Sequence, residues 1–293
     1  MSFKKVPTPS NLAGVGLRSQ YVPHFLKNPR KISKKIGWIE IHSENYYDLN
    51  SVAVKNLITI RQDFPLSLHS VGNSLGSSQK LDLNHLKKLK ALAEITQPFL
   101  ISDHISWGRI NKNHLNDLLP LPYTKESLQA ITDNILQMQD FLKSQILIEN
   151  PSAYLAFKKS EMSEADFINE ITAKTGCALL LDVNNIFVSW QNCAQFEPIN
   201  YLKKLNKKIV KEIHLAGHSQ SEIFDGKKHK KILIDTHNNL VNSQVWQIYK
   251  MAIEIFGKVP SLIEWDQDFP DFEVLLGESK KAKKILENEQ KKL

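Results

Sequence analysis

The stretch Ile146-Leu147-Ile148-Glu149-Asn150-Pro151 sets the interpretation of the whole chain. A short aliphatic run that stops at a carboxylate, an amide and a proline is typical of a buried strand in a parallel sheet. Glu149 is then the last inward-pointing residue of that strand. Because a buried carboxylate is costly unless it meets a positive partner, the sequence poses the question of what Glu149 pairs with.

The same pattern, an apolar run that ends in polar residues, recurs along the chain. It predicts further strands at Gly14–Arg18, Trp38–His42, Pro65–Ser70, Phe99–His104, Cys177–Asp182, Ile209–Leu215 and Ser261–Asp266. Helical patterns separate most of these strands, and such alternation indicates a parallel sheet. Eight units in a chain of this length predict an α/β fold of the (β/α)8 TIM-barrel type. An open doubly wound sheet is the alternative, but Gly14-Val15-Gly16 lacks the later glycine of its phosphate-binding fingerprint.

Capping residues predict where several helices begin and end. The expected N-caps are Thr124, Ser163 and Ser243, and the residues expected just after helices are Gly176 and Gly257. Long loops are expected at Trp107–Pro122 and Gly217–Lys231. No linker or change of composition interrupts residues 1–293, so we expect one domain with a lysine-rich helical tail from about residue 272.

Composition narrows the functional class. The chain has 293 residues, of which 42% are hydrophobic and 24% charged, with a formal net charge of +7. The lysines are scattered over expected helix faces, which favours solvated surfaces over a nucleic-acid partner. Two cysteines, Cys177 and Cys193, give no disulfide framework and fit a reducing cytoplasm. No signal peptide and no membrane-spanning stretch is expected.

Histidines and carboxylates occur near the ends of different strands. They are His69, His104, Glu149, Asp182, His214 and Glu264. The C-terminal strand ends of a TIM barrel meet at one mouth, where these side chains would be costly to desolvate without a cation. Nitrogen and carboxylate ligands together suit iron, manganese or zinc. Asp235 and His237, spaced i, i+2, add a pair that an extended backbone would point in one direction.

Each residue alone has a simpler interpretation, as a hydrogen-bonded strand-end histidine, a helix cap or an ion-pair partner. Glu40 and His42 alternate with Ile39 and Ile41, so the sequence leaves open which pair faces inward. Asp103 is expected to orient the His104 imidazole. Asn45, Asn150 and Asn184 are candidates to orient a substrate, with capping as the alternative.

Glu149 acquires a specific role in this arrangement. Its strand is expected to lie between the strands of His69 and His104 and those of Asp182, His214 and Glu264. A carboxylate has two oxygens, so Glu149 can bridge two metals about 3.5–4 Å apart. The sequence therefore predicts at least two metals, and Asp235 with His237 allows a third.

Several motifs resemble a known family. They are GVGLR, EIHSENY, LHSVGNSLGS, SDHISW, DLLPLPYT, LIENPSAY, LDVNNIFVS, EIHLAGH, IDTH and LIEWD, which run from Gly14 to Asp266. The ligand order is similar to that of endonuclease IV and its xylose-isomerase-like relatives. The closer resemblance is to the multinuclear non-heme iron-dependent oxidative enzymes, a family that includes the oxidase of methanobactin biosynthesis.

This resemblance implies a xylose-isomerase-like TIM barrel with two or three irons. It implies O2-dependent oxidation of cysteines in a ribosomally made precursor peptide, and a partner protein that presents the peptide. By motif, the three ligand sets are His69, His104 and Glu149, then Glu149, Asp182, His214 and Glu264, and lastly Asn185, Asp235 and His237. Catalytic roles fall to Glu149, Asp182 and His214. Endonuclease IV has a histidine where this chain has Asn185, and this difference puts the third site in doubt.

Alternative functions remain at this point. They are phosphodiester hydrolysis of the endonuclease IV type, a xylose-isomerase-like reaction on a sugar, and a metal-binding scaffold without catalysis. The few arginines, Arg18, Arg30, Arg61 and Arg109, form no pattern with aromatic residues that would indicate nucleic-acid binding.

Overall fold

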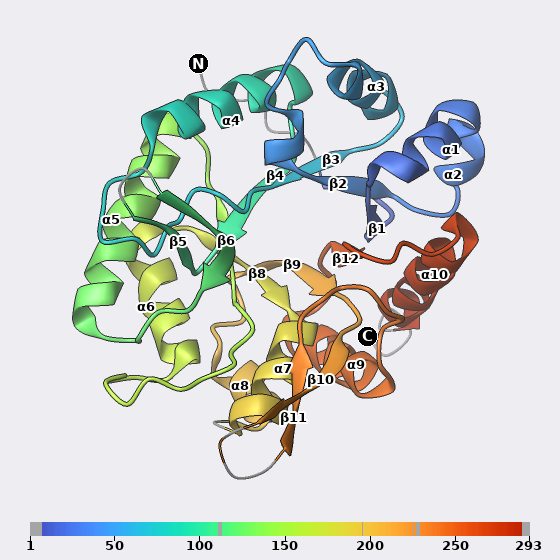
Figure 1. Cartoon of the computed structure of the whole chain (residues 1–293). Helices are drawn as coiled ribbons and strands as arrows, with labels where there is room; N and C mark the ends of the chain where they lie inside the picture. The colour runs from blue at the N-terminus through green and yellow to red at the C-terminus, as the bar shows by residue number, and fades with distance from the viewer. Residues whose placement is uncertain (1–7, 111–112, 195, 225, 227–228, 289–293) are drawn as a thin grey trace.

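A computed structural model describes residues 8–110, 113–194, 196–224, 226 and 229–288 of the chain. Parallel strands close into a barrel at its centre (Figure 1). Around the barrel they are β1 (Ala13–Gly16), β2 (Trp38–His42), β3 (Leu66–His69), β4 (Leu100–His104), β7 (Leu147–Glu149), β8 (Ala178–Asp182), β9 (Val210–Leu215) and β12 (Ser261–Ile263). β12 pairs back onto β1 and closes the barrel. The predicted TIM barrel and its eight strands are confirmed.

Helices surround this barrel (Figure 1). The longer ones are α3 (Val52–Arg61), α4 (Leu83–Thr96), α5 (Lys125–Leu142), α6 (Glu164–Thr175), α7 (Val183–Cys193), α9 (Ser243–Phe256) and α10 (Phe272–Asn288). The shorter ones are η1 (Ser19–Tyr21), α1 (Val22–Lys27), α2 (Pro29–Ile32), η2 (Ser43–Tyr46) and α8 (Pro198–Lys204). Each long helix buries an apolar stripe; Leu128, Ile131, Ile135, Met138 and Leu142 form that of α5.

Alternation along the strands decides which side chains reach the barrel interior. On β2, Ile39 and Ile41 join the large apolar core between sheet and helices. The alternate residues, Glu40 and His42, therefore face inward, which answers the question that the sequence left open. A small separate cluster of Leu147, Ala178 and Leu180 fills part of the interior.

Most predicted helix ends are confirmed. The side chains of Thr124 and Ser163 accept hydrogen bonds from the backbone N–H groups of Ser127 and Asp166. Gly176 (φ 68°) and Gly257 (φ 78°) follow α6 and α9 in backbone conformations that favour glycine. The prediction for Ser243 was wrong by one residue. Asn242 is the N-cap of α9, and its side chain accepts from the Gln244 N–H.

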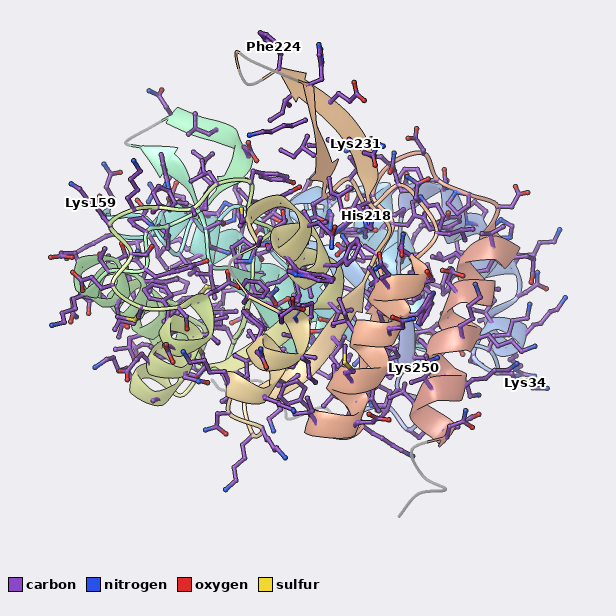
Figure 2. The ribbon with its side chains drawn as sticks, turned by 90° about the horizontal axis from the view of Figure 1, so that it is seen from below. Lys34, Lys159, His218, Phe224, Lys231 and Lys250 are labelled. Atoms are coloured by element: carbon purple, nitrogen blue, oxygen red, sulfur yellow. The ribbon has the colours of Figure 1, made fainter. Side chains whose placement is uncertain are left out.

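The two predicted long loops were wrong, because each contains an antiparallel hairpin. β5 (Trp107–Ile110) pairs with β6 (Asn113–Leu119), and β10 (Ser219–Phe224) pairs with β11 (His229–Ile234). Both hairpins stand outside the barrel sheet, and the β10–β11 strands are largely exposed. Exposed strands need no apolar alternation, so the pattern that reveals the barrel strands is missing from them. Figure 2 shows both hairpins at the same end of the molecule, with Phe224 near the tip of one.

Within the described part of the chain, no helix has the length and apolar character needed to cross a membrane.

Close packing between β1 and β2 supplies a test of this fold. A Cβ on Gly14 would overlap with Cε2 and Cδ2 of the Trp38 ring. Trp38 is fully buried, and its indole N–H donates to the Leu12 carbonyl at 2.9 Å, so its ring has little freedom to move. We expect Gly14→Ala to lower the free energy of unfolding by about 1–3 kcal/mol through overpacking, measured by urea denaturation of the metal-free chain.

Gly277→Ala is the matched control, because a Cβ there meets nothing within 4 Å. Gly277 lies within α10, so alanine should stabilise the chain by about 0.5–1 kcal/mol. Equal effects of the two substitutions would contradict the packing at Gly14.

Candidate metal centre

The predicted ligands from different strands meet at the C-terminal mouth of the barrel. A small cavity of about 140 Å³ opens there. Most of the predicted metal ligands line it, namely His69, His104, Glu149, Asn185, Asp235, His237 and Glu264. The other two, Asp182 and His214, are fully buried and contact this set from below. The structure thus brings all the predicted residues to one place.

Glu149 lies at the centre of the cluster. Its Oε2 is 3.3 Å from Nε2 of His69 and 3.3 Å from Nε2 of His104. Its Oε1 is 4.0 Å from Nδ1 of His214, on the other side. This placement follows from the strand order, because β7 pairs with β4 on one side and with β8 on the other. The two oxygens of one carboxylate therefore face two different groups of side chains.

Two groups of donor atoms around Glu149 match the predicted ligand sets. The donor atoms of each group lie within 4.8 Å of one another. One group is His69, His104 and Glu149, and the other is Glu149, Asp182, His214 and Glu264. Both groups are buried, and their mixed nitrogen and oxygen donors suit a divalent transition metal.

The two carboxylate oxygens of Asp182, at the start of α7, have different surroundings. Its Oδ1 accepts the Asn185 N–H at 2.7 Å and caps the helix. Its Oδ2 is buried without a hydrogen-bond partner among the described residues. Asn150 clamps the backbone of Asp182, accepting from its N–H at 2.9 Å and donating to its carbonyl at 3.0 Å. Asp182 therefore presents one free oxygen from a fixed backbone.

The third predicted set is less compact. Asp235 Oδ1 lies 2.7 Å from His237 Nε2, so these two meet. The extended backbone expected from their i, i+2 spacing was wrong, because His237 has a left-handed backbone (φ 46°). Asn185 donates through Nδ2 to the Asn150 carbonyl, which leaves its buried Oδ1 unpartnered among the described residues. His237 also forms a group with Glu264 and Asp266.

Three side chains that the sequence did not assign to the site, Arg18, His42 and Asp266, belong to it. Arg18 is buried; it donates to Asp266 and approaches Glu264 Oε1 at 3.4 Å. His42 Nε2 lies 3.3 Å from the same Glu264 oxygen. The signal for Arg18 was its position two residues after Gly16 on the inward side of β1. It supplies a permanent positive charge that offsets part of the carboxylate cluster.

Beneath the mouth lie two more carboxylates, Glu40 and Glu212. His214 turns Nδ1 toward Glu264 Oε2 (3.0 Å) and Nε2 toward Glu40 Oε1 (3.1 Å) and Glu212 Oε1 (3.7 Å). The two carboxylates are 1% and 0% exposed, in a layer that branched apolar residues usually fill in TIM barrels. They hold the His214 ring from below.

The expectation for Asp103 was wrong, and for Asn150 and Asn184 the structural alternative fits better than contact with a substrate. Asp103 does not orient His104, since its Oδ1 is 3.9 Å from the imidazole Nδ1; it accepts from the Asn73 side chain at 2.6 Å. Asn150 and Asn184 are buried and bonded within the chain, Asn150 to Asp182 and Asn184 to Asp235 and His218. They position other side chains and do not line the mouth, whereas Asn45 is exposed.

Burial without a neutralising cation shifts the pKa values of the cluster. Burial raises the pKa of Glu149 to about 8 and that of Asp182 to about 7. Burial acts the same way on Glu264, but His214 and His237 outweigh it and hold the pKa of this carboxyl well below its usual range. A metal would reverse the first two shifts, because ligands must be deprotonated. The unpartnered oxygens and nitrogens of this donor set fit a bound divalent cation.

Comparison with known proteins supports the same interpretation of the fold. L-ribulose 3-epimerase matches with a TM-score of 0.60 and 12% identity over 95% of this chain and 95% of that one. Endonuclease IV of Thermus thermophilus matches with a TM-score of 0.58 and 14% identity over 94% and 98%. These likenesses support the class of fold, a (β/α)8 TIM barrel, and at such low identity they concern the fold alone.

Sequence comparison then gives the family. The pattern described as "RiPP precursor modification enzyme MbnB/TglH/ChrH" matches residues 12–287. The UPF0276 protein VP3015 of Vibrio parahaemolyticus is 44% identical over 94% of this chain and 92% of its own length. The chain belongs to the MbnB/TglH/ChrH family of enzymes that modify ribosomally made precursor peptides.

The pKa shifts predict how the metal-free chain responds to pH. Glu149, Asp182 and Glu212, with pKa values of about 8, 7 and 8, keep protons in the folded chain that the unfolded chain has released. The raised pKa values of His214 and His237 act in the same direction above pH 6.5. Stability should therefore fall as pH rises from 6.5 to 9. Calorimetry with a chelator should show Tm decreasing by several degrees, at about 2–4 °C per kcal/mol.

Glu212→Gln provides the control, because an amide of the same shape has no proton to release. Its Tm should fall less steeply over the same pH range. A flat or rising Tm in the unaltered metal-free chain would contradict this account of the buried carboxylates.

Proposed function

We propose that this protein binds two or three irons at the barrel mouth and uses O2 to oxidise cysteine residues of a precursor peptide. The observation that supports it most is the position of Glu149, whose two oxygens face separate groups of imidazoles and carboxylates. Membership of the family supports a peptide as the substrate.

His69, His104 and Glu149 would hold one iron. Ser102 Oγ lies 2.8 Å from Nδ1 of His69, which fixes the ring and leaves Nε2 directed at the centre. Glu149, Asp182, His214 and Glu264 would hold the second iron. The hydrogen bonds of Asn150 and of α7 keep the Asp182 carboxylate in place for this purpose.

Asp235 and His237 would hold a third iron, together with the free oxygen of Asn185. An amide oxygen is a weak ligand, so this position depends on what else reaches it. Asp266 lies 3.3 Å from His237 Nδ1 and is available as a further carboxylate. The third iron is therefore expected to be the most weakly held.

Iron supplies coordination positions for a thiolate and O2 and a path for electrons between them. The chain's contribution is geometric and electrostatic. Glu149, Asp182 and His214, the proposed catalytic residues, are each at most 1% exposed, so they act in a site from which bulk water is largely excluded. The cavity at the mouth is small, at about 140 Å³.

A peptide substrate needs surfaces outside so small a cavity. The β5–β6 and β10–β11 hairpins follow β4 and β9 and so stand on the rim of the mouth. Ile223 and Phe224, near the tip of β10, are 46% and 63% exposed. We assign this rim to the contact with a partner protein that presents the precursor peptide.

Metal counting tests the bridging role of Glu149. Anaerobically prepared protein loaded with ferrous iron should hold at least two irons per chain by elemental analysis. Glu149→Gln should lose more than one equivalent, because one group then faces an amide nitrogen, which is no ligand for iron, and the other faces a neutral amide oxygen, which is a weak one. Loss of only one equivalent would remove the bridge, and an unaltered chain with fewer than two irons would overturn the multinuclear site. Glu94→Gln, on the exposed face of α4, should bind iron like the unaltered chain.

Co-expression tests the reaction. The genes beside this one are searched for a short cysteine-containing peptide and a partner protein, and the protein is produced together with both. We expect a mass change confined to the cysteine-bearing fragment, present in air, absent without O2 and absent with Glu149→Gln. A mass change that needs no O2, or cleavage of abasic DNA by the purified protein without O2, would overturn the oxidative function and favour hydrolysis.

A further inference from the structure

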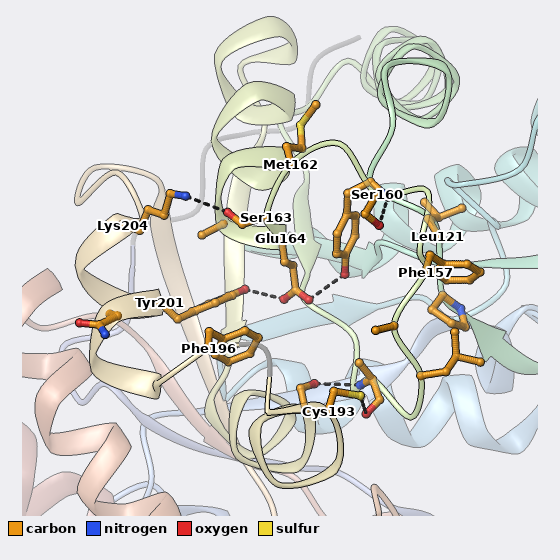
Figure 3. A pocket seen from close by; sticks show the side chains of 18 of the residues that line it. Leu121, Phe157, Ser160, Met162, Ser163, Glu164, Cys193, Phe196, Tyr201 and Lys204 are labelled. Atoms are coloured by element: carbon orange, nitrogen blue, oxygen red, sulfur yellow. Dashed lines mark hydrogen bonds between the residues drawn. The ribbon is translucent and has the colours of Figure 1, made fainter.

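A second and larger cavity, of about 560 Å³, lies beside the mouth. It is enclosed by the segment between β7 and α6, the C-terminal end of α7, and α8 (Figure 3). Apolar and aromatic side chains make up much of its wall, namely Leu121, Leu155, Phe157, Met162 and Phe196. The wall continues from the mouth, because Pro151 and Ser152 line the mouth and Ala153 lines the cavity.

A buried carboxylate points into this apolar space. Glu164, at 8% exposure, accepts hydrogen bonds from the hydroxyls of Tyr123 (2.7 Å) and Tyr201 (2.6 Å). Figure 3 shows Glu164 beside Tyr201, with Phe196 and Cys193 on the facing side of the cavity. Glu164 is the first residue of α6, where the helix dipole and two hydroxyl donors favour the ionised form. Burial nevertheless raises its pKa.

No cation offsets this charge among the described residues. Lys204 also lines the cavity, but its Nζ lies 2.5 Å from Asp166 Oδ2 and 3.0 Å from Ser163 Oγ. A buried carboxylate that only hydroxyls meet is costly compared with one paired to a positive charge. The site therefore has a place for a cation that the chain itself does not fill.

The surroundings suit one kind of cation. The rings of Phe196 and Tyr201 lie 4.7 Å apart beside Glu164, and aromatic faces attract ammonium groups. The apolar wall matches the methylene stem of a lysine, which packs on apolar surface while its charge seeks a polar partner. A volume of about 560 Å³ is within the ordinary range for ligand pockets.

We propose that this cavity binds a primary alkylammonium group, the lysine side chain of the precursor peptide, with its nitrogen at Glu164 and its stem against Leu155, Phe157 and Phe196. The identity of the peptide rests on the proposed function, whereas the ammonium site does not. Because consecutive residues, Ser152 and Ala153, line the mouth and this cavity, a peptide with its cysteine at the mouth would pass this cavity within a few residues.

Cys193 offers a direct reporter for occupancy. It lines the cavity and is half-buried, whereas Cys177, the other cysteine, is 4% exposed. Thiol labelling at pH 8 therefore reads Cys193, and Cys193→Ser should abolish the fast labelling. The probes are n-pentylammonium and 1-pentanol, which share an apolar chain and differ in charge. The full chain is used without iron, peptide or O2.

We expect n-pentylammonium to slow labelling of Cys193 and 1-pentanol to need about tenfold or more the concentration for equal protection, since ~1.4 kcal/mol corresponds to tenfold. Glu164→Gln should remove this preference for the ammonium. Protection is compared with and without probe within each variant, because burial and, after it, the charge of Glu164 raise the pKa of the Cys193 thiol. Glu161→Gln, exposed and outside the cavity wall, should behave like the unaltered chain.

Equal protection by both probes, or an ammonium preference that survives Glu164→Gln, would overturn the proposal. If Glu164→Gln fails to fold, the comparison of the two probes on the unaltered chain decides alone. Because this assay uses no metal and no peptide, its failure leaves the iron count and the peptide mass change unaffected.

A second measurement addresses the peptide itself. For a peptide that the protein modifies and that has a lysine near its cysteine, Glu164→Gln should raise KM about tenfold and leave kcat within about twofold. With methionine in place of that lysine, the two proteins should have the same KM. An equal loss with both peptides would contradict a lysine as the occupant.

Discussion

The structure depends on one buried carboxylate that is shared between two groups of side chains. Glu149 faces His69 and His104 with one oxygen and His214 with the other. This arrangement needs β7 between β4 and β8, and it needs the inward side of each strand to carry the polar residues. Burial raises the pKa of this carboxyl well above its usual range. A bound cation would stabilise its ionised form, so the centre of the barrel favours positive charge.

Much of this could be predicted from the sequence, because barrel strands are buried on both faces. Such strands appear as continuous apolar runs, and a polar residue at the end of a run is conspicuous, as with Glu149, Asp182 and His214. All eight barrel strands follow from that signal. The hairpins β5–β6 and β10–β11 could not be found in this way, because exposed strands carry no obligatory apolar pattern.

The site residues that the sequence did not reveal are of two kinds. For some, it was open whether the side chain faces into the barrel or outward; for others, the partner lies far away in the sequence. Glu40 and His42 alternate with two isoleucines, and only the packing of Ile39 and Ile41 on the helices shows which pair faces inward. The position of Arg18 two residues after Gly16 indicates its inward direction, but its partners Glu264 and Asp266 come from the opposite end of the chain and are not revealed by that local pattern. His237 meets Asp235 through a left-handed backbone, although the spacing alone indicated an extended one.

Helix α7 joins the two cavities and fixes their spacing. Asp182 caps its first turn with one oxygen and offers the other to the metal cluster, while Ser189 and Cys193 on its later turns hold Ala153 at the edge of the larger cavity. From Asn185, which lines the mouth, to Cys193, which lines the larger cavity, the helix rises about 12 Å, which corresponds to about four residues of extended peptide. The helix thus sets this separation, and under the two proposals above it would limit oxidation to cysteines that stand at a set number of residues from the bound lysine.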